Sequence, residues 1–151
     1  MDQLKAALNV LLADMFVMYF KAHSYHWNVE GMFSTQYHTF FGELYEELHD
    51  AIDPTAEHIR TCTDGYAPMS MMEMYNYKTS TEDSVKPVLI TDMLNNLSAA
   101  NTVVLADLNK VFEIAESMNN QGLMDFISTR LDVHHKHEWM FRASAKNTTG
   151  E

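Results

Sequence analysis

The sequence predicts an all-α protein built as a four-helix bundle. Four long segments carry apolar residues at alternating steps of three and four, the period of an amphipathic helix. No segment alternates apolar and polar residues at period two with β-branched enrichment, so a sheet is not expected. A chain of 151 residues is long enough to bury one full core, and we expect a single domain over residues 1–151.

The first two helices are expected on either side of a short break. Gly31 can end the first helix in a left-handed conformation, and Ser34 is a suitable cap for the second, which should end near residues 63–65. Within the second helix, Asp53-Pro54 has the form of an N-cap followed by a proline, so a break and restart or a kink at this point is an open alternative to a continuous helix. The apolar stripes are Leu4, Leu8, Leu11, Met15, Met18, Ala22 and Tyr25, then Phe41, Leu44, Leu48, Ile52 and Ile59.

A long crossover is expected between residues 65 and 87, and residues 70–77 within it can form a short helix. Two further helices follow, separated by the polar segment 119–122. Their stripes are Ile90, Leu94, Leu97, Asn101, Val104, Leu108, Val111, Ala115 and Met118, then Leu123, Ile127, Leu131, His134, Glu138 and Phe141. Four helices with one long connection between the second and third predict a ferritin-like four-helix bundle with a short extra helix in the crossover.

The composition excludes several classes of function. With 21 acidic and 10 basic residues the formal net charge is -11, which argues against a general nucleic-acid surface and favours cations. No glycine-rich phosphate loop occurs among the five Gly. Cys62 stands alone, which suits a reducing compartment, and we expect it to be a small buried apolar residue. The sequence shows neither a signal-peptide pattern nor an uninterrupted apolar span, so we expect a cytoplasmic protein without a membrane anchor.

The candidate metal ligands are His26, His38, Asp53 and Glu57. If His38 and Asp53 lie on one continuous helix, they are about 22 Å apart, too far for one metal ion. His26 and His38 flank the break and can fold towards each other, while Asp53 and Glu57 share a helix face. The pattern predicts two half-sites that face a symmetry partner, although on spacing alone a merely solvated polar face is the commoner explanation.

Other metal-ligand patterns are weaker. Glu46-x-x-His49 has the spacing of di-iron bundles, but we expect it to point away from the core. His134 and Glu138 fall on an apolar stripe, where a buried, hydrogen-bonded pair is expected. Trp27 is expected to anchor an interface. The methionines of the crossover are expected to serve adaptable packing or an interface; they are Met69, Met71, Met72 and Met74.

Several short motifs together span most of the chain. They are His26-Trp27-Asn28-Val29-Glu30-Gly31, Phe33, His38, Leu44-Tyr45-Glu46, Asp53-Pro54-Thr55-Ala56-Glu57-His58 and Trp139-Met140-Phe141-Arg142-Ala143. These motifs resemble the Dps family of miniature ferritins. His26, His38, Asp53 and Glu57 match, in order and spacing, the ferroxidase ligands that the family shares between subunits.

The resemblance implies a hollow dodecamer in which His26 and His38 of one subunit meet Asp53 and Glu57 of its two-fold mate. It implies an iron site (Fe2+/Fe3+) that oxidises Fe(II), with hydrogen peroxide preferred to O2, and storage of ferric mineral as protection against oxidative stress. The chain departs from the family at Gly42, where an acidic residue is usual, and at Pro54. Whether one or two irons bind is therefore open.

Two alternatives remain: a cage-forming metal-binding protein with little ferroxidase activity, and a DNA-compacting Dps. In relatives that bind DNA, the resemblance points to lysine-rich terminal extensions. Here the segment at the start of the first helix contains only Lys5, and the tail 145–151 contains only Lys146. DNA binding is therefore not expected.

Overall fold

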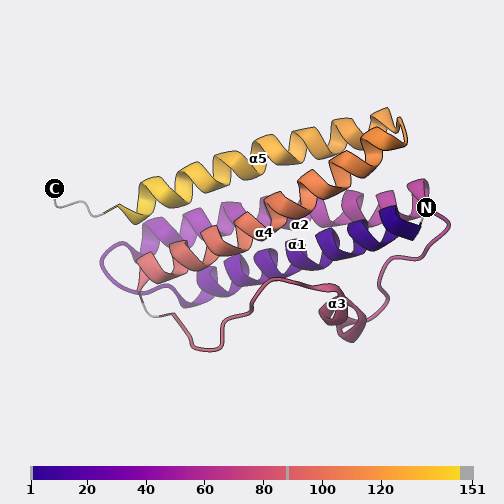
Figure 1. The fold of residues 1–151 in the computed structure, drawn as a ribbon. Coiled ribbons are helices and arrows are strands. Elements are labelled where there is room, and N and C mark those ends of the chain that lie inside the picture. Colours follow the sequence, from indigo (N-terminus) through magenta and orange to yellow (C-terminus); the bar gives the residue numbers. More distant parts are fainter. Residues whose placement is uncertain (1, 88, 147–151) are drawn as a thin grey trace.

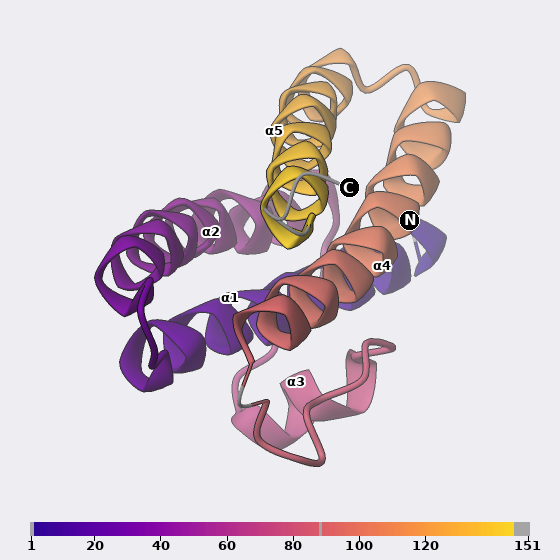
Figure 2. The same ribbon diagram turned by 90° about the vertical axis from the view of Figure 1, so that its left-hand side faces the viewer.

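The computed structural model describes residues 2–87 and 89–146, and these residues form helices and connecting segments with no strand (Figure 1). The helices are α1 (Asp2–Asn28), α2 (Ser34–Cys62), α3 (Met71–Tyr77), α4 (Ile90–Ser117) and α5 (Gln121–Ala145). The four long helices form the bundle, and α3 lies outside it against α1 (Figure 2). The crossover returns along the bundle, so α2 and α4 begin at the same end (Figure 1). The predicted fold class, including the short extra helix, is confirmed.

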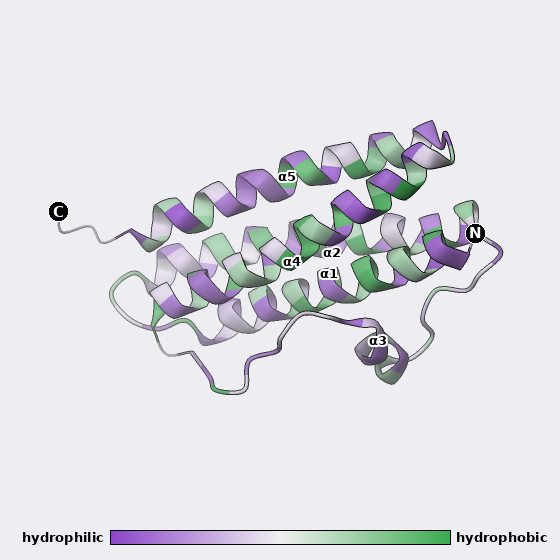
Figure 3. Cartoon of the chain, in the orientation of Figure 1, coloured by the Kyte–Doolittle hydropathy of each residue, from purple (hydrophilic) through white to green (hydrophobic). Residues whose placement is uncertain are grey.

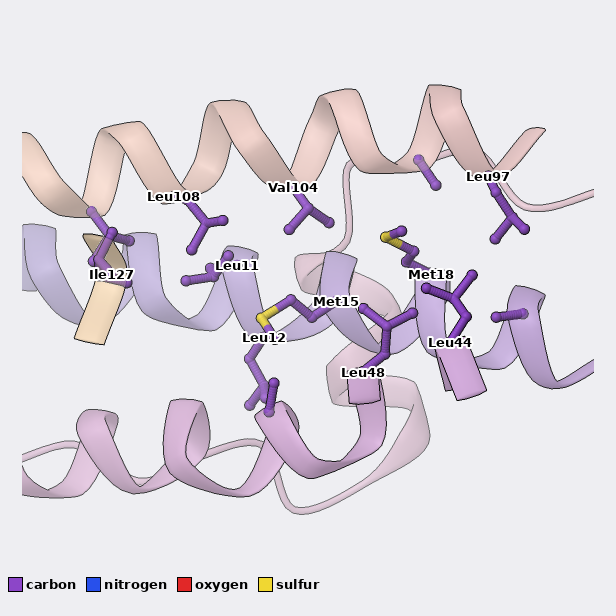
Figure 4. Packing of buried hydrophobic residues seen from close by; sticks show 14 of the residues in the cluster. Leu11, Leu12, Met15, Met18, Leu44, Leu48, Leu97, Val104, Leu108 and Ile127 are labelled. Carbon is purple, nitrogen blue, oxygen red and sulfur yellow. The ribbon is translucent and has the colours of Figure 1, made fainter. Parts of the chain in front are cut away.

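The apolar stripes of the long helices meet in one core between them (Figure 4). All the predicted stripe residues of α1 are buried, whereas Ile52 of α2 and Leu131 of α5 are only half-buried. Thr55 and Arg130 are buried in their place. An α-helix has 3.6 residues per turn, so its buried face moves gradually away from positions chosen at an average spacing of 3.5 residues. Polar residues occupy the outer faces, so apolar and polar residues intermingle along each ribbon (Figure 3).

α1 is the central helix of the bundle, packing against α2, α3 and α4. Over one window its mean hydropathy is 1.3, and by length and composition alone it could cross a membrane. A core helix of a bundle passes the same test, and more than half of that window is buried inside the protein. The hydropathy of α1 is therefore explained by its central position.

Local hydrogen bonds explain where the helices begin and end. Gly31 has the left-handed conformation expected at the break, with φ +105°. The expectation that Ser34 caps α2 is wrong by one residue: Phe33 is the N-cap, and the Ser34 N–H donates to the Gly31 carbonyl at 3.1 Å. Ser70 does cap α3, accepting from the Glu73 N–H at 3.1 Å.

The helix does not break at Asp53-Pro54, a point that the sequence left open, because α2 runs without interruption from Ser34 to Cys62. An interior proline removes one backbone hydrogen bond and costs about 3 kcal/mol. Ala51, Thr55 and Ile59 share one face of the helix and are all buried, and the Thr55 hydroxyl donates to the Ala51 carbonyl at 2.7 Å. Core packing on both sides of Pro54 thus keeps the helix continuous.

Cys62 is half-buried at the end of α2, whereas the sequence predicted a buried apolar residue. Its sulfur lies 3.4 Å from Asn120 Nδ2 and 3.8 Å from His58 Nδ1. The thiol therefore makes polar contacts across to the turn between α4 and α5.

A buried carboxylate fixes the crossover to α1. Asp14 is fully buried and accepts hydrogen bonds from the N–H and hydroxyl groups of both Thr79 and Ser80, at 2.5 to 2.8 Å. Burial raises the pKa of Asp14, but these hydrogen bonds outweigh it and the pKa lies below its ordinary value. Nearby, Lys21 of α1 pairs with Asp83 at 2.5 Å. The long connection is therefore held by specific polar contacts.

A layer of polar side chains crosses the interior between α2, α4 and α5. Arg130 forms an ion pair with Glu47, and its Nη2 lies 2.9 Å from His134 Nε2. His137 also donates to Glu47, at 2.8 Å. The other ring nitrogen of His134 lies 2.7 Å from Asn101 Oδ1. Burial raises the pKa of Glu47, but hydrogen bonds from His137 and Arg130 outweigh it and bring the pKa to about 2.

The expected pairing of His134 with Glu138 is only partly right. His134 is fully buried, as predicted, but the two side chains meet through Asn101, whose amide donates to Glu138 at 3.3 Å. Ser98 also donates to Glu138, at 2.8 Å. Stripe positions identified the buried residues but not their hydrogen-bond partners.

We expect Glu47→Gln to lower the free energy of unfolding at neutral pH by about 3 kcal/mol, because it leaves the buried Arg130 charge unpaired. The greater stability of the wild type over Glu47→Gln should disappear as the pH falls from the ordinary pKa of glutamate, 4.5, through the pKa of Glu47 in the folded protein, about 2. Denaturant unfolding at fixed protein concentration, from about pH 7 to pH 2, measures both effects. The exposed neighbour Glu46→Gln is the control; an equal loss in that variant would contradict the assignment.

Candidate functional site

The histidines on either side of the break between α1 and α2 form a reciprocal clasp. His26 Nδ1 donates to the backbone carbonyl of His38 at 2.6 Å, and His38 Nδ1 donates to the carbonyl of His26 at 2.8 Å. The two rings stack with centroids 3.7 Å apart and an interplanar angle of 23°. The expectation that the break folds these residues towards each other is confirmed.

The clasp determines which nitrogen of each ring can bind a metal. A carbonyl oxygen can only accept a hydrogen bond, so each Nδ1 must carry the proton. A neutral imidazole then has its lone pair on Nε2. Histidine ligands of metals characteristically donate their other N–H in this way, which fixes the tautomer and the orientation of the ring. Both imidazoles are thus prepared as Nε2 donors on one surface.

Asp53 and Glu57 form the second half of the predicted set. They lie four residues apart on the outer face of α2, and both are exposed. Because α2 is continuous, Asp53 lies about 22 Å from His38 along the helix axis. Across residues 2–87 and 89–146, no three His, Cys, Asp or Glu side chains gather closely enough to hold a metal ion. The structure brings the two histidines together and leaves the two carboxylates apart from them.

The competing metal pattern points into solvent, as predicted. Glu46 and His49 are both exposed on α2. Asp132 and His135 of α5 are exposed as well. Neither pair reaches the interior of the bundle.

Gly42 lies directly beneath the clasp. It is buried, and a Cβ atom added there would lie 3.1 Å from His26 Nδ1 and 3.2 Å from His26 Cε1. Most real Cβ contacts are longer than this, so a side chain at position 42 must push the imidazole by a few tenths of an ångström. The missing side chain therefore gives the His26 ring its room.

Aromatic side chains to which the sequence assigned no role at the site adjoin the clasp. Tyr45 contacts His26 edge-on, with ring centroids 5.2 Å apart, and stacks on His23 at 3.8 Å and 14°. The Tyr19 hydroxyl lies 3.1 Å from His23 Nδ1. Burial, with His26 and His49 nearby, lowers the pKa of His23. The four-residue spacing of Tyr19 and His23 was the available signal, since such residues share a helix face.

Comparison with known proteins places the chain in a family. A family model for the ferritin-like domain matches residues 5–150. DNA protection during starvation protein 2 of Bacillus anthracis is 30% identical over 141 residues, which are 93% of this chain and 95% of that protein. The chain belongs to the Dps family of ferritin-like proteins. The resemblance carried by the motifs around His26 and Asp53 is thereby confirmed.

Solved Dps structures agree with this assignment. The Vibrio cholerae Dps protein, described as a member of a superfamily of ferritin-like diiron-carboxylate proteins, superposes with a TM-score of 0.90 at 26% identity, covering 96% of this chain and 90% of that one. Dps from Staphylococcus aureus superposes with a TM-score of 0.87 at 26% identity, covering 97% of both chains. The bundle and crossover are thus those of the Dps family.

We expect Gly42→Ala to weaken metal binding by about tenfold, because the new methyl group displaces His26 from its clasp. Gly42→Asp adds the same contact together with a carboxylate, so it should bind metal more tightly than Gly42→Ala. Anaerobic titration with Co(II), followed by its visible absorption, measures both affinities. Gly122→Ala is the matched control because a Cβ there meets nothing closer than 3.9 Å; unchanged affinity in Gly42→Ala would show that the ring has room.

Proposed function

We propose that this Dps-family chain is a ferroxidase and iron-storage protein that binds Fe(II) at sites shared between subunits of a homo-oligomer. The reciprocal clasp carries the proposal, because it turns Nε2 of both His26 and His38 into prepared metal donors. Family membership supports a general role in iron storage and protection. The finer parts, namely oxidation by hydrogen peroxide and a dodecameric cage, are our inference from the family pattern.

The partner subunit would supply the carboxylates. Asp53 and Glu57 of a two-fold mate would complete a set of two imidazoles and two carboxylates, which suits iron chemically. None of the four residues is assigned a nucleophilic role; they hold and orient the metal ion. Two Fe(II) ions would give one electron each to hydrogen peroxide, whose O–O bond breaks and which takes up two protons to leave two water molecules.

Exposed apolar side chains around the clasp support a covered surface. Trp27 is 58% exposed, Phe33 is 53% exposed and Met32 is 92% exposed. Large apolar side chains gathered on one surface characteristically mark an interface. A second subunit placed there would shield them and bring its carboxylates to the histidines.

The charge of the chain supports cation uptake. A net charge of -11 per chain attracts Fe(II) and would be multiplied by assembly. A lone cysteine fits a reducing compartment, so we place the protein in the cytoplasm.

A metal-binding cage with little ferroxidase activity is the second candidate. It is favoured by Gly42, which provides no carboxylate beside His26. Anaerobic loading with Fe(II) followed by a pulse of peroxide separates the two functions, because rapid loss of Fe(II) belongs only to the ferroxidase.

Shared sites predict complementation between inactive subunits. We expect His26→Ala/His38→Ala subunits and Asp53→Ala/Glu57→Ala subunits to be inactive alone. Equal, random mixing should restore about one quarter of the sites, because only a mixed pair rebuilds an intact set. Peroxide-driven loss of Fe(II) in co-assembled protein is the measurement.

Matched controls define the result. A Glu46→Ala/His49→Ala subunit changes the same residue types on the exposed face of α2 and should retain full activity. If tagged subunits prove that mixed pairs have formed and yet no activity returns, the shared-site proposal is wrong.

We propose further that this protein does not coat DNA directly, because affinity for a duplex depends on Lys and Arg that neutralise phosphates and the chain is strongly acidic. The tail residues 147–151 lie outside the described structure. We expect no retardation of plasmid DNA by metal-free protein in a gel shift at physiological salt. Saturable retardation without metal would overturn the proposal, whereas retardation only with added divalent cations indicates bridging between two anions.

A further inference from the structure

Two acidic side chains meet between α1 and α4 at the point where the crossover is attached. α1 and α4 run in opposite directions (Figure 1), and their register is given by Asn96, whose amide donates to the Tyr25 hydroxyl at 3.2 Å. Asp14 lies about three helical turns before Tyr25, and Asp107 lies about three turns after Asn96. The same faces of the two helices meet again at these positions, which brings the carboxyl groups of Asp14 and Asp107 within hydrogen-bond reach.

The hydrogen bonds of this pair call for a proton on one carboxyl group. Asp14 is fully buried, and its Oδ1 accepts three hydrogen bonds, from the Thr79 N–H and from the N–H and hydroxyl of Ser80. Its Oδ2 accepts one, from the Thr79 hydroxyl, and has a lone pair left for another. Asp107 Oδ2 is buried and meets no donor among the described residues. A protonated Asp107 satisfies both atoms, because its O–H can donate to Asp14.

The charges around the pair favour the same arrangement. Among the described residues, the charged groups that act on Asp107 are Asp14 of α1 and the exposed Lys110 of its own helix. Two cations of α1 and the crossover already pair with carboxylates of the crossover, Lys21 with Asp83 and Lys78 with Glu82. Burial, the hydrogen bond to Asp14 and the negative charge of Asp14 raise the pKa of Asp107 to about 7, against an opposite effect of Lys110.

We propose that Asp107 shares a proton with Asp14, and that this proton is a pH-sensitive latch that holds the crossover to α1 and α4. When the proton passes to solvent at higher pH, two buried negative charges face each other, and their repulsion pushes Asp14 away from Thr79 and Ser80. α3 ends at Tyr77, two residues before Thr79, so α3 is loosened from α1 together with this segment. The latch needs no metal ion and is a property of the fold beyond iron oxidation.

The latch should weaken as the pH rises. In an opened crossover Asp107 is solvated and has its ordinary pKa of 3.8, whereas in the closed crossover its pKa is about 7. The closed state therefore binds the proton more tightly, and its stabilisation is complete below the ordinary pKa and lost as the pH rises to about 7. Within this window the open fraction should grow by up to about tenfold per pH unit, and above it the fraction should stay constant.

Hydrogen–deuterium exchange of the assembled protein, without added iron, measures the opening. The amides of Thr79 and Ser80 donate to Asp14, so their protection reports whether the crossover is closed. We use protection factors, which correct for the base-catalysed exchange of a free amide. In the wild type they should fall by up to about tenfold per pH unit from about pH 5.5 to about pH 7 and then level off.

Asp107→Asn imitates the closed latch, because its amide keeps the size of the side chain and always carries a donor for Asp14. Protection of Thr79 and Ser80 in this variant should equal that of the wild type at about pH 5.5 and should not change up to about pH 8.5. Asp92→Asn is the matched control, since Asp92 is an exposed residue of the same helix. Its protection factors should follow those of the wild type.

Infrared spectroscopy detects the proton directly. At about pH 6, where ordinary carboxyl groups are ionised, the wild type and Asp92→Asn should show the C=O stretch of a protonated carboxylic acid, and Asp107→Asn should lack it. A wild type without this band overturns the shared proton. Protection that does not depend on pH in the wild type, or the same dependence in Asp107→Asn, overturns the latch. Both measurements on the wild type test the proposal even if a variant does not assemble.

Discussion

The continuity of α2 is the constraint on which the proposed site depends. One unbroken helix carries His38 near its start and Asp53 beyond its middle, so no single chain can bring them to the same ion. The helix remains unbroken because Thr55 and Ile59 are buried in the core, which outweighs the hydrogen bond lost at Pro54. A kink large enough to change this spacing would have to remove those side chains from the core. Core packing therefore separates the two half-sites, and the proposed site requires a second subunit to bring them together.

The interior between α2, α4 and α5 has its own charged groups, and they pair with one another. Arg130 supplies the positive charge that balances Glu47, and His134 and His137 add further hydrogen bonds, while the buried Nε of Arg130 has no partner among the described residues. A metal ion placed among these groups would meet a fixed guanidinium and carboxylates already in use. The proposed metal site accordingly uses His26 and His38, where the clasp orients the two imidazoles without burying a charge.

Periodicity predicted the fold well because burial repeats along each helix. The stripe of α1 was correct throughout, and the break at Gly31 had the expected left-handed backbone. Periodicity could not predict pairing between helices, and for that reason Glu47 was missed although it anchors α2 to Arg130 of α5. Local rules also failed at Pro54, where tertiary packing overrode the preference for a helix start. At the site, the sequence predicted that the histidines approach each other, but the reciprocal hydrogen bonds required the structure.

Gly42 links the geometry of the clasp to its chemistry. The absence of a side chain lets His26 lie close to α2, and this closeness allows each histidine to donate to the other's carbonyl. The same absence leaves position 42 without the carboxylate that the resemblance to the Dps family leads us to expect. Gly42 therefore favours the orientation of His26 and argues against a second iron at the proposed site.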